Sequence, residues 1–289
     1  MSSLLPSSFA IESLLRSWLL EDLGRGDHTT AAITAAIVGQ KLSQGSARWI
    51  LKEAGVVAGL PIALQVFRLL DPEMQGTFAV PDGQACPVGT ELIIFQGDRS
   101  ALLTGERVAL NLAMRLSGIA TLTRAYVDCL ADLPCQLVDT RKTTPGLRIL
   151  EKYASQVGGA KNHRLGLDDA IMIKDNHIVA AGGILAAIEA VRQFMPYPLS
   201  IEVETENLDQ VREALRGDVD VIMLDNMPLE SMREAVQHIR SYNPRIKIEA
   251  SGNMTLDRLR SVAETGVDFI STSAPITRSS WLDLSMRMI

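Results

Sequence analysis

The chain has 289 residues, of which 34 are acidic and 28 are Lys or Arg, so its formal net charge is -6. Such a chain has no overall attraction to nucleic acid or to anionic membranes, and its 4% aromatic content is too low for a base-stacking surface. The length and the 47% hydrophobic content favour one large α/β domain, or one with a smaller companion.

The N-terminal segment lacks the pattern of a targeting sequence. No basic residue precedes the apolar part of MSSLLPSSFAIESLL, and no later apolar run is long enough to span a bilayer. We therefore expect a cytoplasmic protein without membrane partners. The three cysteines lack the CxxC spacing of zinc sites, which predicts reduced thiols.

Local patterns then predict a helix followed by a small sheet domain. Ser7 or Ser8 is a suitable cap for the helix, which ends at the glycines of EDLGRGDHTT. Its apolar face carries Leu14, Leu15, Trp18 and Leu19. Residues 41–98 contain short β-prone segments punctuated by Gly, Pro and Asp, among them SARWILK, GVVAG, GTFAV and TELIIFQG. Residues 102–130 have a helical pattern.

Beyond residue 130 the chain alternates apolar runs with amphipathic segments. There are six such runs: QLV, AIMI, LSIEV, VDVIML, IKIEA and VDFIS. Continuous apolar runs are typical of parallel strands that are buried on both faces. Their number and spacing are compatible with an incomplete α/β barrel and with a doubly wound sheet.

Each of the six runs is followed by polar residues. They are Asp139–Lys142, Lys174, Glu204, Asp225, Ser251–Asn253 and Thr272–Ser273. Active sites of parallel α/β folds lie at the carboxyl ends of the strands. In a barrel all six positions would meet at one mouth, whereas in an open sheet only those at the switch point would. Six polar strand ends thus favour the barrel.

Five groups that can carry positive charge lie within a 34-residue window: Arg141, Lys142, His163, Arg164 and Lys174. Arginine pairs with carboxylate or phosphate through its planar fork, and lysine acts as a point charge. The cluster therefore predicts a multiply anionic ligand. Taken alone, His163 is equally compatible with an ordinary loop histidine.

Glu204 and Asp225 follow neighbouring strands and form an anionic counterpart that suits Mg²⁺ or a developing carbocation. Glu202 precedes Glu204 on the same strand, and we expect one of the two to face the lumen and the other the helix layer. The loops ASGNM and ISTSAP offer backbone N–H groups to a terminal phosphate, although SGN is also compatible with a simple helix cap.

Several blocks of the chain resemble the quinolinate phosphoribosyltransferases. The blocks are EDLGRGDHTT, GERVALNLAMRLSGIAT, DTRKTTPGLR, KNHRLGLDDAIMIKDNHI, IEVET, VIMLDN, EASGNM and LDLSMR. They run in order along nearly the whole chain. The resemblance implies transfer of a phosphoribosyl group from 5-phosphoribosyl 1-diphosphate to quinolinate. Diphosphate and CO2 are lost, and the product is nicotinate mononucleotide for NAD biosynthesis.

The resemblance also implies roles for individual residues. Quinolinate would be bound by Thr140, Arg141, His163, Arg164 and Lys174. Lys142, Glu204 and Asp225 would be catalytic, with Lys142 facing the diphosphate and the two carboxylates meeting the ribose hydroxyls and Mg²⁺. The 5-phosphate would be bound by Ser251, Gly252, Asn253, Thr272, Ser273 and Ala274. Ser273 replaces a glycine found in many members, but it keeps the backbone N–H.

The family fold and assembly follow from the same resemblance. It implies an N-terminal α+β open sheet sandwich over residues 1–114, joined by the tail 276–289, beside an incomplete barrel over residues 115–275. Arg107 matches an arginine that reaches the pocket of the neighbouring subunit. This implies an obligate head-to-tail homodimer, which could associate further into a hexamer.

Two other functions are compatible with parts of the pattern. A barrel lyase could form a Schiff base on Lys142 or Lys174, but a single carbonyl substrate does not require the arginines nearby. A non-catalytic relative, of the kind associated with molybdenum transport, could keep the fold. The intact TRK and NHR blocks and Lys174 count against it.

Overall fold

The computed structural model describes residues 5–36 and 44–289. By packing, the chain divides into two compact units. The first comprises residues up to 124, 144–159 and 278–289, and the second comprises 125–143 and 160–277. The division into 1–114 with 276–289 and 115–275 stays a prediction about folding domains.

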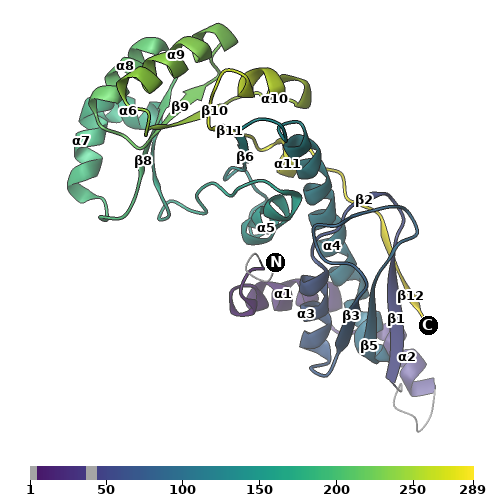
Figure 1. The fold of residues 1–289 in the computed structure, drawn as a ribbon. Coiled ribbons are helices and arrows are strands. Elements are labelled where there is room, and N and C mark those ends of the chain that lie inside the picture. Colours follow the sequence, from purple (N-terminus) through teal and green to yellow (C-terminus); the bar gives the residue numbers. More distant parts are fainter. Residues whose placement is uncertain (1–4, 37–43) are drawn as a thin grey trace. The chain divides into compact units, whose positions relative to one another are not determined.

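The first unit is built on a four-stranded antiparallel sheet with the order β12-β1-β5-β3. Its strands are β1 (Gln44–Leu51), β3 (Gln75–Phe78), β5 (Glu91–Asp98) and β12 (Leu284–Met288). The C-terminal strand β12 pairs with β1 from Ala47↔Met288 to Leu51↔Leu284, so the tail is an edge strand of this sheet (Figure 1). A second, two-stranded sheet joins β2 (Gly55–Val56) to β4 (Ala85–Cys86).

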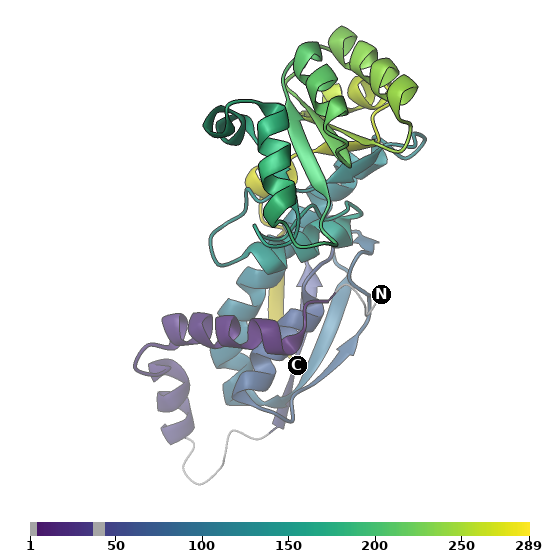
Figure 2. The same cartoon turned by 90° about the vertical axis from the view of Figure 1, so that its left-hand side faces the viewer.

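The helices of the first unit are α1 (Ser8–Leu23), α2 (His28–Ala36), α3 (Leu60–Leu70), most of α4 (Arg99–Asp128) and α5 (Arg148–Gly158). Trp49, Phe67 and Phe95 pack edge to face between the sheet and α3, with ring centroids 4.7–6.5 Å apart. The predicted helix α1 is confirmed and lies beside α3 (Figure 2), burying Ile11, Leu15 and Leu19.

Two helices of this unit escaped sequence analysis. The run LPIALQVFRLL of α3 lies in the region read as strands, because a short apolar run does not distinguish a buried helix from a strand. Its first turn is fixed by Asp82, whose carboxylate accepts the backbone N–H groups of Gly59 and Leu60. Helix α2 begins after Asp27, which accepts the N–H of Thr30 at 2.9 Å as an N-cap.

The second unit contains six parallel strands with the order β6-β11-β10-β9-β8-β7. They are β6 (Gln136–Val138), β7 (Ile171–Ile173), β8 (Ile201–Thr205), β9 (Val221–Asp225), β10 (Lys247–Ser251) and β11 (Phe269–Ser271). All six predicted strands are therefore confirmed. The end strands β6 and β7 do not pair with each other in the described chain, which makes this an incomplete α/β barrel.

The helices of this unit follow its strands. They are α6 (Asp175–Ala181), α7 (Ile184–Phe194), α8 (Leu208–Arg216), α9 (Leu229–Tyr242), α10 (Leu256–Ala263) and α11 (Ala274–Thr277). Within the described residues no single helix has the length and apolarity needed to cross a bilayer, and only the bent pair α6 and α7 passes that test when taken together.

Strand register gives the parallel sheet a polar and an apolar face. Glu204 pairs with Met223, and Met223 pairs with Glu249, so these side chains point to the same side. We call this side the inner face; it also carries Met172, Glu202, Asp225 and Ser251. The opposite face is buried and mostly apolar, with Val203, Ile222, Leu224, Ile248, Ala250 and Ile270 fully covered.

The same register corrects one prediction. Glu202 and Glu204 were expected on opposite faces, but residues two apart on a strand share a face. Both glutamates therefore belong to the inner face. Side chains of successive residues point to opposite faces of the sheet, so the apolar Val203 between them points outward.

Candidate active site

The carboxyl ends of four neighbouring strands supply the polar rim of the inner face. Asp225 ends β9 and Ser251 ends β10, and the two are register partners. Lys174 comes directly after β7 and is the N-cap residue of α6. Its backbone N–H donates to Nδ1 of His177 at 3.0 Å, which fixes the turn out of the strand.

Lys174 and Glu204 bring the predicted cationic and anionic groups into contact. The Nζ of Lys174 forms an ion pair with Oε2 of Glu204 on the adjacent strand β8. The lysine side chain is 39% exposed and that of the glutamate 15%. Both groups are therefore at the mouth of the sheet, where a ligand can reach the lysine.

Deeper on the inner face lies a buried cluster of His163, Glu202 and Glu249. Nε2 of His163 is 3.1 Å from Oε2 of Glu202 and 3.5 Å from Oε2 of Glu249. The backbone N–H of His163 donates to Asp139 at 2.8 Å. Sequence analysis missed Glu249 and the role of Asp139. The available signal was a charged residue inside an apolar strand run, as in IKIEA.

Protons are held tightly in this cluster. Burial lowers the pKa of His163, but hydrogen bonds to Glu202 and Glu249 and their charges outweigh it and raise the pKa to about 10. The backbone nitrogen of Arg164 lies 2.7 Å from Nδ1 of the ring. With its pKa raised in this way, the ring is positively charged at neutral pH and is balanced by the two carboxylates. Burial correspondingly raises the pKa of Glu202.

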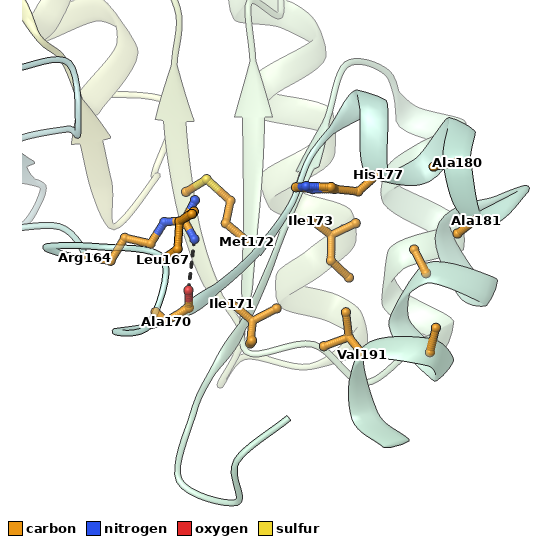
Figure 3. A pocket seen from close by; sticks show the side chains of 12 residues that line it. Arg164, Leu167, Ala170, Ile171, Met172, Ile173, His177, Ala180, Ala181 and Val191 are labelled. Atoms are coloured by element: carbon orange, nitrogen blue, oxygen red, sulfur yellow. Dashed lines mark hydrogen bonds between the residues drawn. The ribbon is translucent and has the colours of Figure 1, made fainter. Parts of the chain in front are cut away.

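Arg164 is a buried cation, with 9% of its surface exposed. Its guanidinium donates to the carbonyl of Ala170 at 3.0 Å (Figure 3). Burial and the nearby charge of Arg141 both lower its pKa. Two guanidinium groups in this proximity repel each other, and an anion bound beside them would relieve that repulsion.

Beside Arg164 lies a cavity of about 470 Å³ between β7 and the helices α6 and α7. Its walls include Ile171, Met172, Ile173, His177 and Val191, as Figure 3 shows. These walls are mainly apolar.

The loop after β6 carries Thr140, Arg141 and Lys142. The hydroxyl of Thr140 accepts the backbone N–H of Lys142 at 3.0 Å, and the Lys142 side chain is exposed. Arg107 is exposed on α4 in the first unit. It lines a separate cavity of about 590 Å³ together with Trp18, Asn111, Arg115 and Trp281.

The turn Ser251–Gly252–Asn253 has a conformation that requires glycine. Gly252 has φ +95°, and a Cβ there would lie 2.1 Å from Oδ1 of Asn226. Asn226, which sequence analysis missed, donates its backbone N–H to Ser251 and has φ 52°. Its amide also donates to Asp225 at 2.7 Å. Asn226 thus connects the carboxylate at the end of β9 to the turn after β10.

The last predicted loop is ordered by its own side chains. The hydroxyl of Thr272 accepts the N–H of Ala274 at 3.1 Å, and the carbonyl of Ser273 accepts the N–H groups of Ile276 and Thr277. Thr272 and Ala274 are buried, whereas Ser273 is half-buried. Of the three residues predicted for the 5-phosphate in this loop, Ser273 is the most accessible.

Comparison with known proteins places this geometry in a family. Two family models match, the quinolinate phosphoribosyl transferase N-terminal domain over residues 27–117 and the C-terminal domain over residues 119–287. The chain belongs to the quinolinate phosphoribosyltransferase family. This confirms the resemblance found in its sequence.

Individual relatives agree with the family assignment. The chain is 57% identical to a probable nicotinate-nucleotide pyrophosphorylase [carboxylating] of Synechocystis, over 99% of this chain and 95% of the relative. It is 45% identical to the protein of the same name in Bacillus subtilis, over 96% and 92%. The crystal structure of NadC from Streptococcus pyogenes matches with a TM-score of 0.91 and 40% identity, over 99% and 98%.

In this quinolinate phosphoribosyltransferase family member, the donor set of the inner face fits Mg²⁺. Glu204 and Asp225 lie on the same face of adjacent strands, and carboxylate oxygens are the ligands that Mg²⁺ prefers. Asn226 holds Oδ2 of Asp225, and Lys174 holds Oε2 of Glu204, so one oxygen of each carboxylate is already oriented.

Proposed function

We propose that this protein transfers a phosphoribosyl group from 5-phosphoribosyl 1-diphosphate to quinolinate and releases diphosphate, CO2 and nicotinate mononucleotide. The observation that carries the proposal is the contact of Lys174 with Glu204 at the mouth of the inner face. This contact places a cationic side chain, which can bind an anionic substrate, beside a carboxylate, which can stabilise a developing positive charge. The names of the curated relatives support the same reaction.

The dicarboxylate would be held by cations of the inner rim. We assign Arg141, Arg164 and Lys174 to the two carboxylates of quinolinate and call these three residues the clamp. Thr140 and His163 belong to the predicted binding set as well. Since Arg164 is buried, its charge is poorly solvated, and a carboxylate gains more from it than from an exposed cation.

The ribosyl group would be held at the anionic side. As its bond to diphosphate breaks, positive charge develops on the sugar, and the carboxylates of Glu204 and Asp225 stabilise that charge. The exposed amine of Lys142 faces the departing diphosphate. Mg²⁺ bound at Glu204 and Asp225 would neutralise diphosphate charge. Backbone N–H groups of Ser251–Asn253 and Thr272–Ala274 would bind the 5-phosphate.

Catalysis then consists mainly of positioning and electrostatics. The quinolinate nitrogen attacks the ribosyl carbon, and the C–O bond to diphosphate breaks. In the resulting pyridinium the bond between C2 and its carboxylate breaks, and CO2 leaves. The electron pair stays on C2, stabilised by the adjacent positive nitrogen, until it takes a proton from solvent. No residue needs to act as a covalent nucleophile.

We further propose that the working form is a homodimer in the cytoplasm. The exposed Arg107 of one subunit would complete the binding site of its partner. Quinolinate and the phosphoribosyl donor are both multiply charged, and such molecules are retained in an aqueous compartment. A hexamer of such dimers is compatible with this assignment.

The contacts of Lys174 argue against a Schiff base on that lysine. Lys174 is ion-paired with Glu204, whereas Schiff-base formation needs a free neutral amine. Borohydride with candidate ketones tests this directly, since trapping of a covalent adduct on Lys142 or Lys174 would favour the lyase. Absence of quinolinate-dependent diphosphate release would instead favour a non-catalytic relative.

The decisive assay combines quinolinate, 5-phosphoribosyl 1-diphosphate and Mg²⁺ with the protein and measures nicotinate mononucleotide by chromatography. Nicotinate replaces quinolinate in the control. We expect product only from quinolinate, because a site built for two carboxylates leaves a buried cation unpaired when one is missing. Product from nicotinate at a similar rate would contradict the assignment of the clamp.

A further inference from the structure

The side-chain amide of Asn226 contacts two parts of the candidate active site, one at each end. Its Nδ2 donates to Oδ2 of Asp225 at 2.7 Å. Its Oδ1 accepts from the side-chain amide of Asn253 at 3.3 Å. A carboxylate only accepts hydrogen bonds, so the amide nitrogen must face Asp225, which leaves the amide oxygen for Asn253. The orientation of the Asn226 side chain is therefore set from both ends.

The backbone of Asn226 is fixed as well. Its φ of 52° lies in the left-handed region, which asparagine adopts more readily than most residues. Its N–H donates to the carbonyl of Ser251 at 3.0 Å. The next carbonyl, that of Met227, accepts from the guanidinium of Arg258 on α10 at 3.3 Å. The turn after β9 is thus joined to the turn and the helix that follow β10.

Gly252 leaves the space that the Asn226 side chain occupies. A Cβ on Gly252 would lie 2.1 Å from Oδ1 and 2.4 Å from Cγ of Asn226, far closer than van der Waals contact allows. An alanine at this position would therefore push the amide away from its place beside Asp225. The glycine serves this contact in addition to its own backbone conformation.

Asp225 gains a defined orientation from the contact. It ends β9 and is half-buried, so its carboxylate lies at the mouth of the inner face. Because Oδ2 accepts from Asn226, Oδ1 is the oxygen that points to a ligand. A carboxylate that is oriented before the ligand arrives loses less rotational freedom on binding, and the ligand is bound more tightly.

We propose that Asn226 is a positioning residue that orients the carboxylate of Asp225 toward the ribose of the phosphoribosyl donor. The turn Ser251–Asn253 holds Asn226, so this turn and Asp225 bind the donor as one unit. The inference rests on the proposed function for the identity of the ligand. The Asn226 side chain is exposed, so direct contact with the donor is the alternative.

A double-mutant cycle on donor binding separates the two roles. Calorimetry measures the dissociation constant of 5-phosphoribosyl 1-diphosphate with Mg²⁺ present. Asn226→Gly keeps the left-handed backbone and removes only the side chain. We expect roughly 10-fold weaker binding, as the loss of one hydrogen bond to a charged group produces. In an Asp225→Ala background the same change should weaken binding by no more than about 2-fold. The full loss without Asp225 would overturn the proposal.

Asp218→Gly is the matched control for this cycle. Asp218 has the same φ of 52°, is exposed and lies before β9, at the amino end of that strand. We expect this variant to bind the donor as the wild type does. In Asn226→Gly the KM for the donor should rise, whereas the KM for quinolinate should stay within about 2-fold, because only the ribose side is disturbed. Equal increases in both KM values would mean a general loss of structure and would also overturn the proposal.

Gly252→Ala tests the link between the turn and Asn226. In the Asn226→Gly background it should weaken donor binding less than in the wild type, because the amide that the new Cβ displaces is absent. An equal effect in both backgrounds would refute the link. A wild type that binds the donor but makes no nicotinate mononucleotide would refute the proposed function, whereas the cycle on donor binding would still decide the role of Asn226.

Discussion

The two units bury carboxylates in opposite ways. In the first unit Glu151 is fully buried and accepts four hydrogen bonds, two from the guanidinium of Arg115 and two from the N–H and hydroxyl of Thr144. In the second unit Glu202 and Glu249 share one imidazole, and one oxygen of each is unpaired. A buried carboxylate whose oxygens are all hydrogen-bonded stabilises the fold. Buried carboxylates with an unpaired oxygen are instead typical of functional sites.

The largest effect on stability should come from the satisfied carboxylate. Glu151→Ala removes the buried carboxylate that pairs with the Arg115 guanidinium, and breaking a buried pair costs about 3–5 kcal/mol. Urea unfolding measures it. Glu12→Ala is the control, because Glu12 belongs to an exposed pair with Arg16 worth at most about 1 kcal/mol. Equal losses of unfolding free energy in the two variants would show that Glu151 does not stabilise the first unit in this way.

Substitutions at the carboxyl ends of the strands should reduce activity more than stability. Lys174→Ala is expected to reduce quinolinate turnover by roughly 100- to 1000-fold, as loss of one fixed charge-stabilising group does. Arg141→Ala should behave alike. Lys247→Ala is a matched control, since Lys247 lies at the opposite end of the same sheet. Steady-state kinetics measures the effect, and near-normal turnover in Lys174→Ala would refute the clamp.

A smaller effect is expected at the turn after β10. Gly252→Ala combines a left-handed backbone with a Cβ against Asn226, and we expect a loss of about 1–3 kcal/mol in stability with a raised KM for the phosphoribosyl donor. Gly89→Ala is matched in backbone, with φ +87°, but has nothing within 4 Å of the added Cβ. If both variants bind the donor normally, the turn does not hold the phosphate.

The smallest effect is expected at the unsatisfied carboxylates. Glu249→Gln relieves repulsion with Glu202 and keeps an oxygen for His163, so its unfolding free energy should stay within about 1 kcal/mol of wild type. Glu151→Gln is the matched variant in the first unit, and it should lose clearly more unfolding free energy than Glu249→Gln. A larger loss for Glu249→Gln would mean that the cluster stabilises the fold as Glu151 does.

Much of the fold was predictable because parallel strands leave a simple signal. Runs such as VDVIML are apolar on both faces and end in one polar residue, which located the strands and their carboxyl ends. Helix α3 was not predictable in this way, since LPIALQVFRLL is apolar around most of its circumference. Contacts distant in sequence, such as β12 with β1, also leave no local pattern.

The site was predictable in its rim but not in its interior. Lys174, Glu204 and Asp225 follow apolar runs and are visible as strand ends. Glu249 and Asn226 act through partners on other strands, and only register reveals which side chains meet. The contact of the His163 ring with two buried carboxylates is likewise a three-dimensional fact that a motif cannot contain.

We propose that the inner face transfers a phosphoribosyl group to quinolinate and then releases its 2-carboxylate. The most direct measurement uses quinolinate labelled at that carboxylate and follows labelled CO2 together with diphosphate. We predict equal amounts of both, only when the phosphoribosyl donor and Mg²⁺ are present. Diphosphate without CO2, or CO2 without the donor, would contradict the claim.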